Sequence, residues 1–124
     1  MYHYTYHTEK KTWYEALREC KLKGGNLASI TSKEEQVKIV SGMPNWSDGG
    51  WWIGLHSDRT WRWVDGRTLA WANWFPGGPK DSTGCAGMQI RDSDKQCEWF
   101  DKECDAEYKY ICKFQSKHGF FIIS

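Results

Sequence analysis

Long apolar runs, an excess of charge of one sign and zinc-type cysteine spacing are all lacking in this sequence. The apolar stretch at residues 120–123 is far shorter than the roughly 20 residues that span a membrane, so no membrane insertion is expected. The formal net charge is +1, from 17 basic and 16 acidic residues, and therefore does not favour nucleic acid or acidic lipid as a partner. The absence of a Cys-x-x-Cys pair argues against structural zinc.

Catalytic signatures are lacking too. Four histidines occur, but His3 and His7 would lie about 13 Å apart along a strand, too far to share a metal ion. No local motif pairs a nucleophile with a base, so we do not expect an enzyme.

Tryptophan and cysteine, by contrast, are abundant. The 124 residues suffice for one domain with one core, to which the nine tryptophans contribute much of the buried area. Five cysteines in so short a chain predict a disulfide framework and an oxidising, extracellular location. Asn45-Trp46-Ser47 is a glycosylation sequon and makes Asn45 a candidate site on an exposed loop.

The chain begins with a predicted strand and helix. Residues 2–7 alternate Tyr with His and Thr, the period of a half-buried strand, so we expect Met1 to mark a domain boundary rather than a signal peptide. Thr12 and Glu15 form a capping box. Apolar residues at positions 13, 16, 17 and 20 then give one helix face, which ends at Gly24-Gly25.

A second helix is predicted after Ser32, which forms a capping pattern with Glu35. Val37 and Val40 are expected on its inner face, and Gly42 is expected to end it.

The second half of the chain predicts strands around one long loop. Strands are expected at residues 51–55, 62–64, 85–90 and 108–114, with a polar loop at residues 91–96. Residues 70–84 are rich in Pro and Gly, and irregular loops of that length are usually functional. Two helices followed by strands indicate the α+β class.

Several motifs follow one another at characteristic distances. They are Cys20, Trp52-Ile53-Gly54-Leu55, Trp61-Arg62-Trp63-Val64-Asp65-Gly66, Pro76-Gly77-Gly78-Pro79-Lys80, Cys85, Trp99-Phe100-Asp101, Cys104 and Tyr110-Ile111-Cys112. As a set, they resemble the C-type lectin-like domain over residues 2–114, which leaves residues 115–124 as an extension of unknown role. The resemblance implies a double-loop α+β fold with two helices and small antiparallel sheets, stapled by disulfides.

The residues alone do not determine the disulfide pairing, because any of the five cysteines can be the odd one. The resemblance implies the bridges Cys20–Cys112 and Cys85–Cys104. Cys97 is then left over, and we expect a free thiol there. A disulfide-linked dimer through Cys97 is one alternative, and pairing of Cys97 rather than Cys85 with Cys104 is another.

The resemblance also implies a calcium site that grips a sugar, but most of its ligand positions are occupied by unsuitable residues. Gly78 and Lys80 flank Pro79 where the family has oxygen ligands, and Thr83 stands where it has a carboxylate. Phe100 replaces an asparagine, so only Asp101 keeps its oxygens. A lone carboxylate beside a lysine does not offset the cost of dehydrating a divalent ion, so we expect neither calcium nor another cofactor.

Some relatives have a second calcium site that uses an acid near the second helix and another just after the last cysteine. Glu35 is present at the first place, but Lys113 stands at the second. We therefore expect no calcium there either.

These observations predict a calcium-independent, extracellular recognition module in which the long loop forms the binding face. A protein ligand is favoured over a simple sugar, and a carbohydrate-binding lectin with a non-standard site is the alternative. Side chains that commonly anchor interfaces supply the candidate contacts. They are Trp74, Lys80, Asp81, Arg91, Asp92 and Asp101.

Overall fold

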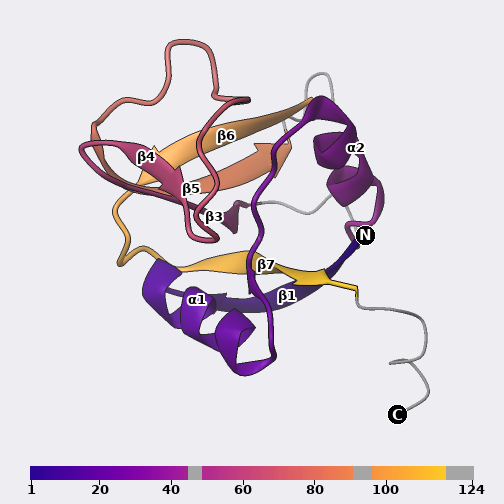
Figure 1. Ribbon diagram of the computed structural model, residues 1–124. Helices are drawn as coiled ribbons and strands as arrows, with labels where there is room; N and C mark the ends of the chain where they lie inside the picture. Colours follow the sequence, from indigo (N-terminus) through magenta and orange to yellow (C-terminus); the bar gives the residue numbers. More distant parts are fainter. Residues whose placement is uncertain (45–48, 91–95, 117–124) are drawn as a thin grey trace, which may run out of the picture.

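The computed structural model describes residues 1–44, 49–90 and 96–116 (Figure 1). Asn45, Arg91 and Asp92 lie outside these residues. The elements are β1 (Tyr2–Lys11), α1 (Trp13–Leu22), β2 (Asn26–Leu27), α2 (Lys33–Ser41), β3 (Trp51–Asp58), β4 (Trp61–Trp63), β5 (Thr83–Ile90), β6 (Cys97–Lys102) and β7 (Tyr108–Gln115). The predicted α+β class is confirmed.

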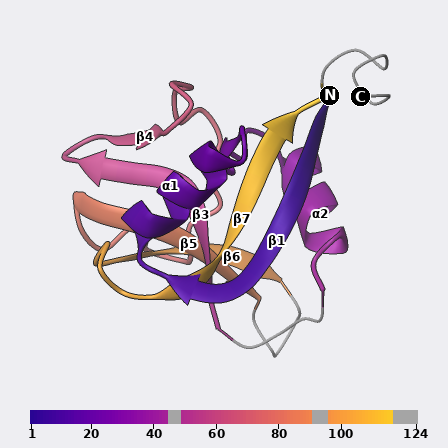
Figure 2. The same ribbon diagram turned by 90° about the horizontal axis from the view of Figure 1, so that it is seen from below.

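The strands join in one sheet with the order β1-β7-β3-β5-β6, in which β2 also pairs with β7 and β4 with β3. The β3–β7 pair is parallel, and the other pairs between these strands are antiparallel. β1 runs beside β7 and places Tyr2 opposite Gln115, which brings the two ends of the domain together (Figure 2). α1 lies against β1 and β7, whereas α2 lies near the start of β1 (Figures 1 and 2).

The first helix begins as its sequence predicts. The Thr12 side chain accepts a hydrogen bond from the Glu15 N–H at 3.3 Å, and the Glu15 carboxylate accepts one from the Thr12 N–H at 3.0 Å. This capping box orients the helix so that Trp13, Ala16 and Cys20 are buried against the sheet. The Trp13 indole donates to the Ile53 carbonyl at 2.8 Å and so links the helix to the central strand.

The prediction for the inner face of the second helix is wrong in part. Val37 is 58% exposed, and Val40 is only half-buried. Gln36 and Ile39 are buried instead. The Gln36 amide oxygen accepts a hydrogen bond from the Trp99 indole at 2.7 Å, and this partner lets a polar residue take an inward position.

The Trp52-Ile53-Gly54-Leu55 motif forms the centre of the sheet. Ile53 and Leu55 pack in one hydrophobic cluster, and Trp52 packs in a second cluster on the other side of β3. A Cβ atom on Gly54 would lie 2.5 Å from the Leu27 carbonyl oxygen, so only glycine lets β2 approach this closely.

β6 was not predicted, although its neighbour β5 was expected at residues 85–90 and is present. Its residues do not alternate between polar and apolar, because Trp99 and Phe100 pack in clusters on opposite sides of the sheet. A strand covered on both sides lacks the period-two pattern from which strands are recognised.

Candidate functional site

The long loop between β4 and β5 runs over β6, toward the top of Figure 1. Backbone hydrogen bonds fix it there: the Phe75 N–H donates to the Trp99 carbonyl at 2.9 Å, and the Trp99 N–H donates to the Asn73 carbonyl at 2.8 Å. The Asn73 side chain also donates to the Cys97 carbonyl at 2.9 Å. The candidate binding face therefore rests on an ordered strand.

Asp101, the remaining acid of the implied calcium site, already has partners. Its Oδ1 accepts from the Lys80 N–H at 3.0 Å, and its Oδ2 accepts from the Asp81 N–H at 3.0 Å. Both oxygens thus bond to the backbone of the loop. The structure brings three of the predicted contact residues together at this point, and the Lys80 and Asp81 side chains are exposed.

The loop next to Asp101 is tightly packed at Gly78. The Gly78–Pro79 peptide is cis. A Cβ atom at Gly78 would lie 2.4 Å from Cε1 of Phe75. A side chain at position 78 would have to displace the Phe75 ring, so restoring the family's residue there requires the loop to repack.

Trp74, another predicted contact residue, is half-buried in an aromatic cluster. Its ring meets Trp61 at 5.0 Å and Trp99 at 5.7 Å between centroids, both edge-on. Trp71 packs against the same Trp99 ring. These contacts make Trp74 a support for the loop, with only part of its ring open to a ligand.

Phe100, at the place where the family has an asparagine, is part of an aromatic cluster. It packs against Trp52 and Tyr108, with centroid distances of 6.4 and 5.2 Å. The side chain that replaces the family's asparagine has therefore joined the hydrophobic core.

The position of the second implied calcium site contains an ion pair. Lys113 Nζ lies 2.7 Å from Glu35 Oε2, and both side chains are largely buried. Lys113 also donates to the Ser29 carbonyl at 3.1 Å and to the Ser29 hydroxyl at 2.9 Å. Tyr4 donates a hydrogen bond to Glu35, and so does the Thr31 N–H. Burial alone would raise the pKa of Glu35, but the hydrogen bonds from Lys113, Tyr4 and Thr31 outweigh it and hold this pKa below its ordinary value.

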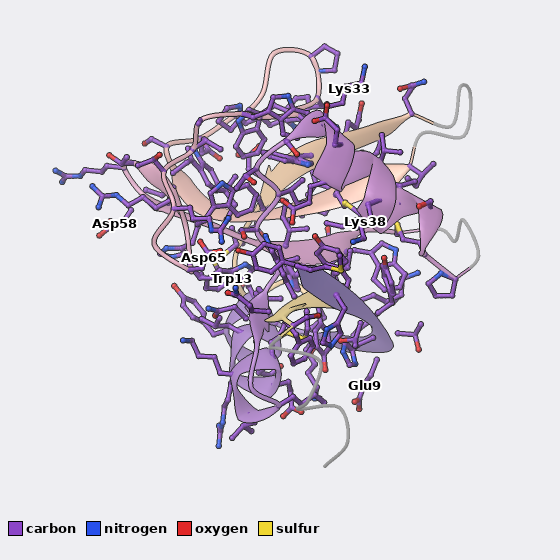
Figure 3. All side chains as sticks on the ribbon, turned by 45° about the vertical axis from the view of Figure 1, so that its right-hand side comes forward. Glu9, Trp13, Lys33, Lys38, Asp58 and Asp65 are labelled. Carbon is purple, nitrogen blue, oxygen red and sulfur yellow. A yellow bond between two sulfur atoms is a disulfide. The ribbon has the colours of Figure 1, made fainter. Side chains whose placement is uncertain are left out.

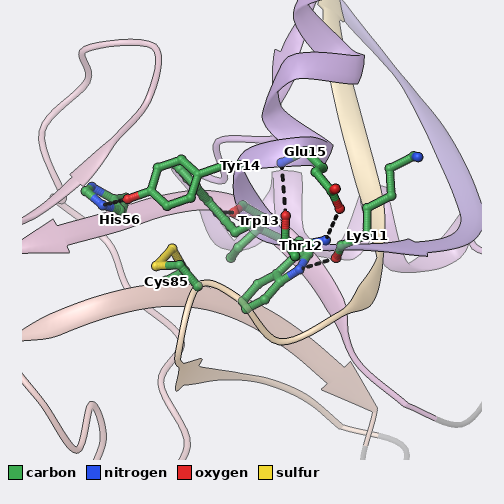
Figure 4. Close-up of a disulfide and its surroundings, with 10 residues drawn as sticks. Lys11, Thr12, Trp13, Tyr14, Glu15, His56 and Cys85 are labelled. Atoms are coloured by element: carbon green, nitrogen blue, oxygen red, sulfur yellow. Dashed lines mark hydrogen bonds between the residues drawn. A yellow bond between two sulfur atoms is a disulfide. The ribbon is translucent and has the colours of Figure 1, made fainter.

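The two expected disulfides are present. Cys20 is bonded to Cys112 and Cys85 to Cys104. His56 lies beside the second bridge, and its ring stacks on Trp13 (Figure 4). Ligating atoms of His56, Cys85 and Cys104 lie within 4.8 Å of one another, but the disulfide occupies both sulfurs.

Cys97 is a free thiol, as expected, so the alternative pairing with Cys104 is excluded. Its Sγ lies 3.7 Å from the Met88 sulfur. Burial raises the pKa of the Cys97 thiol to about 12, and the Glu98 carboxylate adds to the rise. The thiol therefore stays protonated at neutral pH.

We expect Cys97 in the native protein to react with Ellman's reagent at pH 8 about a thousandfold more slowly than an unfolded thiol, because so little thiolate is present. Absorbance measured with and without guanidinium chloride checks this, and one thiol per chain should react after unfolding. Rapid labelling of the native protein would contradict the expectation. So would a dimer band on a non-reducing gel that a reducing agent converts to monomer.

Within the described residues, no helix is long and apolar enough to cross a membrane. The geometry defines a disulfide-stapled α+β domain with a long loop that is anchored on β6.

Comparison with known proteins identifies the family. The Lectin C-type domain family matches residues 9–114. The chain therefore belongs to the C-type lectin domain family, whose relatives are non-enzymatic binding proteins.

Individual relatives agree. The chain is 34% identical to the C-type lectin lectoxin-Lio3 of Erythrolamprus poecilogyrus, covering 94% of this chain and 76% of that protein. It is 36% identical to the human versican core protein over 89% of this chain, but this spans only 3% of versican. A crystal structure of calcium-independent type II antifreeze protein superposes with a TM-score of 0.75 at 32% identity, covering 90% of this chain and 85% of that one.

Proposed function

We propose that this chain is an extracellular recognition module that binds a protein ligand through the long-loop face without calcium. The ligand contacts centre on Lys80 and Asp81, which are exposed, with Asp101 and the open edge of Trp74 beside them. Arg91 and Asp92, the remaining predicted contact residues, lie outside the residues that the structure describes.

One observation carries the proposal: both oxygens of the Asp101 carboxylate accept hydrogen bonds from the loop backbone. Each Asp101 oxygen already accepts a backbone N–H at 3.0 Å, and the adjoining Lys80 carries a positive charge. Asp101 and the neighbouring Asp81 would supply at most two carboxylates, whereas calcium takes six to eight oxygen ligands. Hydrogen bonds from the protein itself therefore do the work of loop closure that a metal would otherwise perform.

The Glu35–Lys113 pair supports calcium independence at the second place. The Lys113 ammonium neutralises Glu35 at 2.7 Å and fills the space beside it. A divalent ion would bring two like charges together in a largely buried position. The calcium-independent antifreeze protein offers a precedent for this fold without the metal.

A protein ligand is favoured over a simple sugar by the chemistry of the exposed loop. Lys80 and Asp81 are adjacent, exposed and of opposite charge, an arrangement typical of the polar rim of a protein interface. Without a metal, a monosaccharide would depend on hydrogen bonds and on the open part of the Trp74 ring. Asp101, the best acceptor at the face, is already engaged.

We expect the unfolding temperature to be the same in millimolar calcium and in chelator. A calcium ion bound at a hundred times its Kd would stabilise the fold by about 2.7 kcal/mol, which is easily resolved. Differential scanning calorimetry under oxidising conditions checks this, and magnesium serves as the control for ionic strength. A clear shift with calcium alone would refute calcium independence.

The ligand class is tested by probing an array of extracellular proteins and a glycan array with the labelled domain in chelator. A protein ligand should bind in chelator, resist competition by simple monosaccharides, and be weakened at least tenfold by Lys80→Glu. Lys10→Glu, on the distant strand β1, makes the same charge change and should leave binding intact. Binding that monosaccharides abolish would favour the lectin alternative.

A further inference from the structure

Away from the long-loop face, three arginines surround a cavity of about 600 Å³ beside the β3–β4 hairpin. They are Arg59, Arg62 and Arg67, and the wall between them is formed by Trp61, Leu69 and two threonines. Among the residues that the structure describes, none with a carboxylate lines the cavity. A volume of this size accommodates a drug-sized polar ligand.

Two of the three guanidinium groups are available for a ligand. Arg67 is engaged, because its Nε lies 3.3 Å from Asp65 Oδ2 and it donates to the Tyr2 hydroxyl. Arg59 and Arg62 are exposed, and neither has an ion pair with any residue that the structure describes. Asp58, the other nearby acid, lines a second depression together with His56, and Arg62 lines both depressions. Figure 3 labels Asp58 at the left edge of the molecule and Asp65 closer to its centre.

The backbone at Arg59 is unusual. Its φ angle is +86°, and it is the one non-glycine residue with positive φ among those that the structure describes. A turn at this place favours glycine or asparagine, because a Cβ atom makes the left-handed region unfavourable. A strained residue at a surface turn points to a function for its side chain, here a guanidinium group directed outward at the rim of the cavity.

We propose that this cavity, the arginine pocket, binds a sulfated glycan chain. Guanidinium groups match the planar, multi-oxygen face of a sulfate through paired N–H donors, and Arg59 and Arg62 offer two such groups. Thr60 and Thr68 add hydroxyls that can bond to sugar hydroxyls. The half-buried Trp61 ring, held edge-on by Trp74 at 5.0 Å, gives the apolar faces of a sugar a rigid wall.

The overall charge separates this ligand from other polyanions. Nucleic acid is bound mainly through many phosphate contacts along a broad basic surface. This chain has a net charge of only +1. Beside the cavity, two arginines have no ion pair with a described residue, Arg59 and Arg62. Local sulfate groups on a short sugar segment fit a small cavity with two open guanidinium groups better than a long phosphate backbone does.

The test is isothermal titration of the whole chain with a heparin-derived hexasaccharide in chelator, at two salt concentrations. The sulfated hexasaccharide should bind, with an affinity that falls as salt rises, and the same sugar without its sulfates should not. No binding of the sulfated sugar, or equal binding of the desulfated one, overturns the proposal. A single-stranded DNA of equal charge that binds as tightly would also overturn it, in favour of a general polyanion site.

Variants locate the site. Arg59→Gly combined with Arg62→Gln should weaken the hexasaccharide at least tenfold. The double variant Lys10→Gln/Lys21→Gln removes two exposed charges elsewhere and should change affinity less than twofold. Because Arg59→Gly relieves the positive φ, the arginine-pocket variant should unfold no earlier than the parent chain. Arg62→Gln alone provides a second check, with a smaller loss. Equal losses in pocket and control variants would overturn the proposal.

Lys80→Glu should leave hexasaccharide binding unchanged, so failure here is distinct from failure of the long-loop proposal.

Discussion

Replacing Lys113 with methionine is expected to lower the free energy of unfolding by about 3–5 kcal/mol. Lys113 is only 6% exposed, and its ammonium group lies 2.7 Å from the Glu35 carboxylate. Methionine fills a similar volume but leaves that carboxylate without a counter-charge in a largely buried position. It also removes the two hydrogen bonds to Ser29. Urea denaturation followed by tryptophan fluorescence measures the loss.

Two companion variants show whether the ion pair is the cause. Lys113→Met combined with Glu35→Gln removes the stranded charge and should recover a substantial part of the lost stability. Lys102→Met changes an exposed lysine at the end of β6 and should shift stability by less than about 0.5 kcal/mol. Unchanged stability of Lys113→Met would show that the pair contributes nothing net.

The Glu35–Lys113 pair also makes the free energy of unfolding depend on pH in the acidic range. Because the pKa of Glu35 is lower in the folded than in the unfolded chain, ionised Glu35 stabilises the fold above its unfolded pKa of about 4.3. That contribution is lost as the pH falls from there through the folded pKa. Glu35→Gln should therefore flatten the stability profile below about pH 4.5, and a parallel profile would contradict this assignment.

Removing the Cys20–Cys112 disulfide by a double alanine substitution is expected to cost about 4.5 kcal/mol. The bridge joins residues 92 positions apart, and the loss of loop-closure entropy in the unfolded chain grows with that separation. Both cysteines are also fully buried, so alanine leaves small cavities between α1 and β7. Denaturant unfolding measures the change, provided that the variant still folds.

The second disulfide is an internal comparison. Cys85 and Cys104 are only 19 positions apart, so their removal should cost about 3 kcal/mol. If the two double variants lose equal stability, or the shorter bridge contributes more, loop length does not govern the effect. Strain or packing near His56 would then be the dominant cause.

Some of these features were predictable because they are local. The Thr12–Glu15 capping box acts over three residues, and the pattern in the sequence alone predicts the hydrogen bonds that the structure contains. The same is true of the strand at residues 51–55, whose continuous apolar residues indicate a strand buried on both faces. The disulfide pairing came from the resemblance to the family, since spacing alone left several pairings open.

Other features depended on residues far apart in the sequence. Gln36 faces the core because the Trp99 indole, 63 residues away, donates a hydrogen bond to it. The periodicity of the helix sequence cannot reveal a partner so far along the chain. The same holds for β6, which is covered on both sides and so lacks alternation.

The sequence by itself determined the α+β class and the family motifs, because each depends on residue identity at a few neighbouring positions. Only the tertiary structure decided that Asp101 bonds to the loop backbone, that Lys113 pairs with Glu35 and that three arginines share one cavity. Each of these depends on distances between groups that the chain brings together only on folding, when strand register and helix position are fixed by packing.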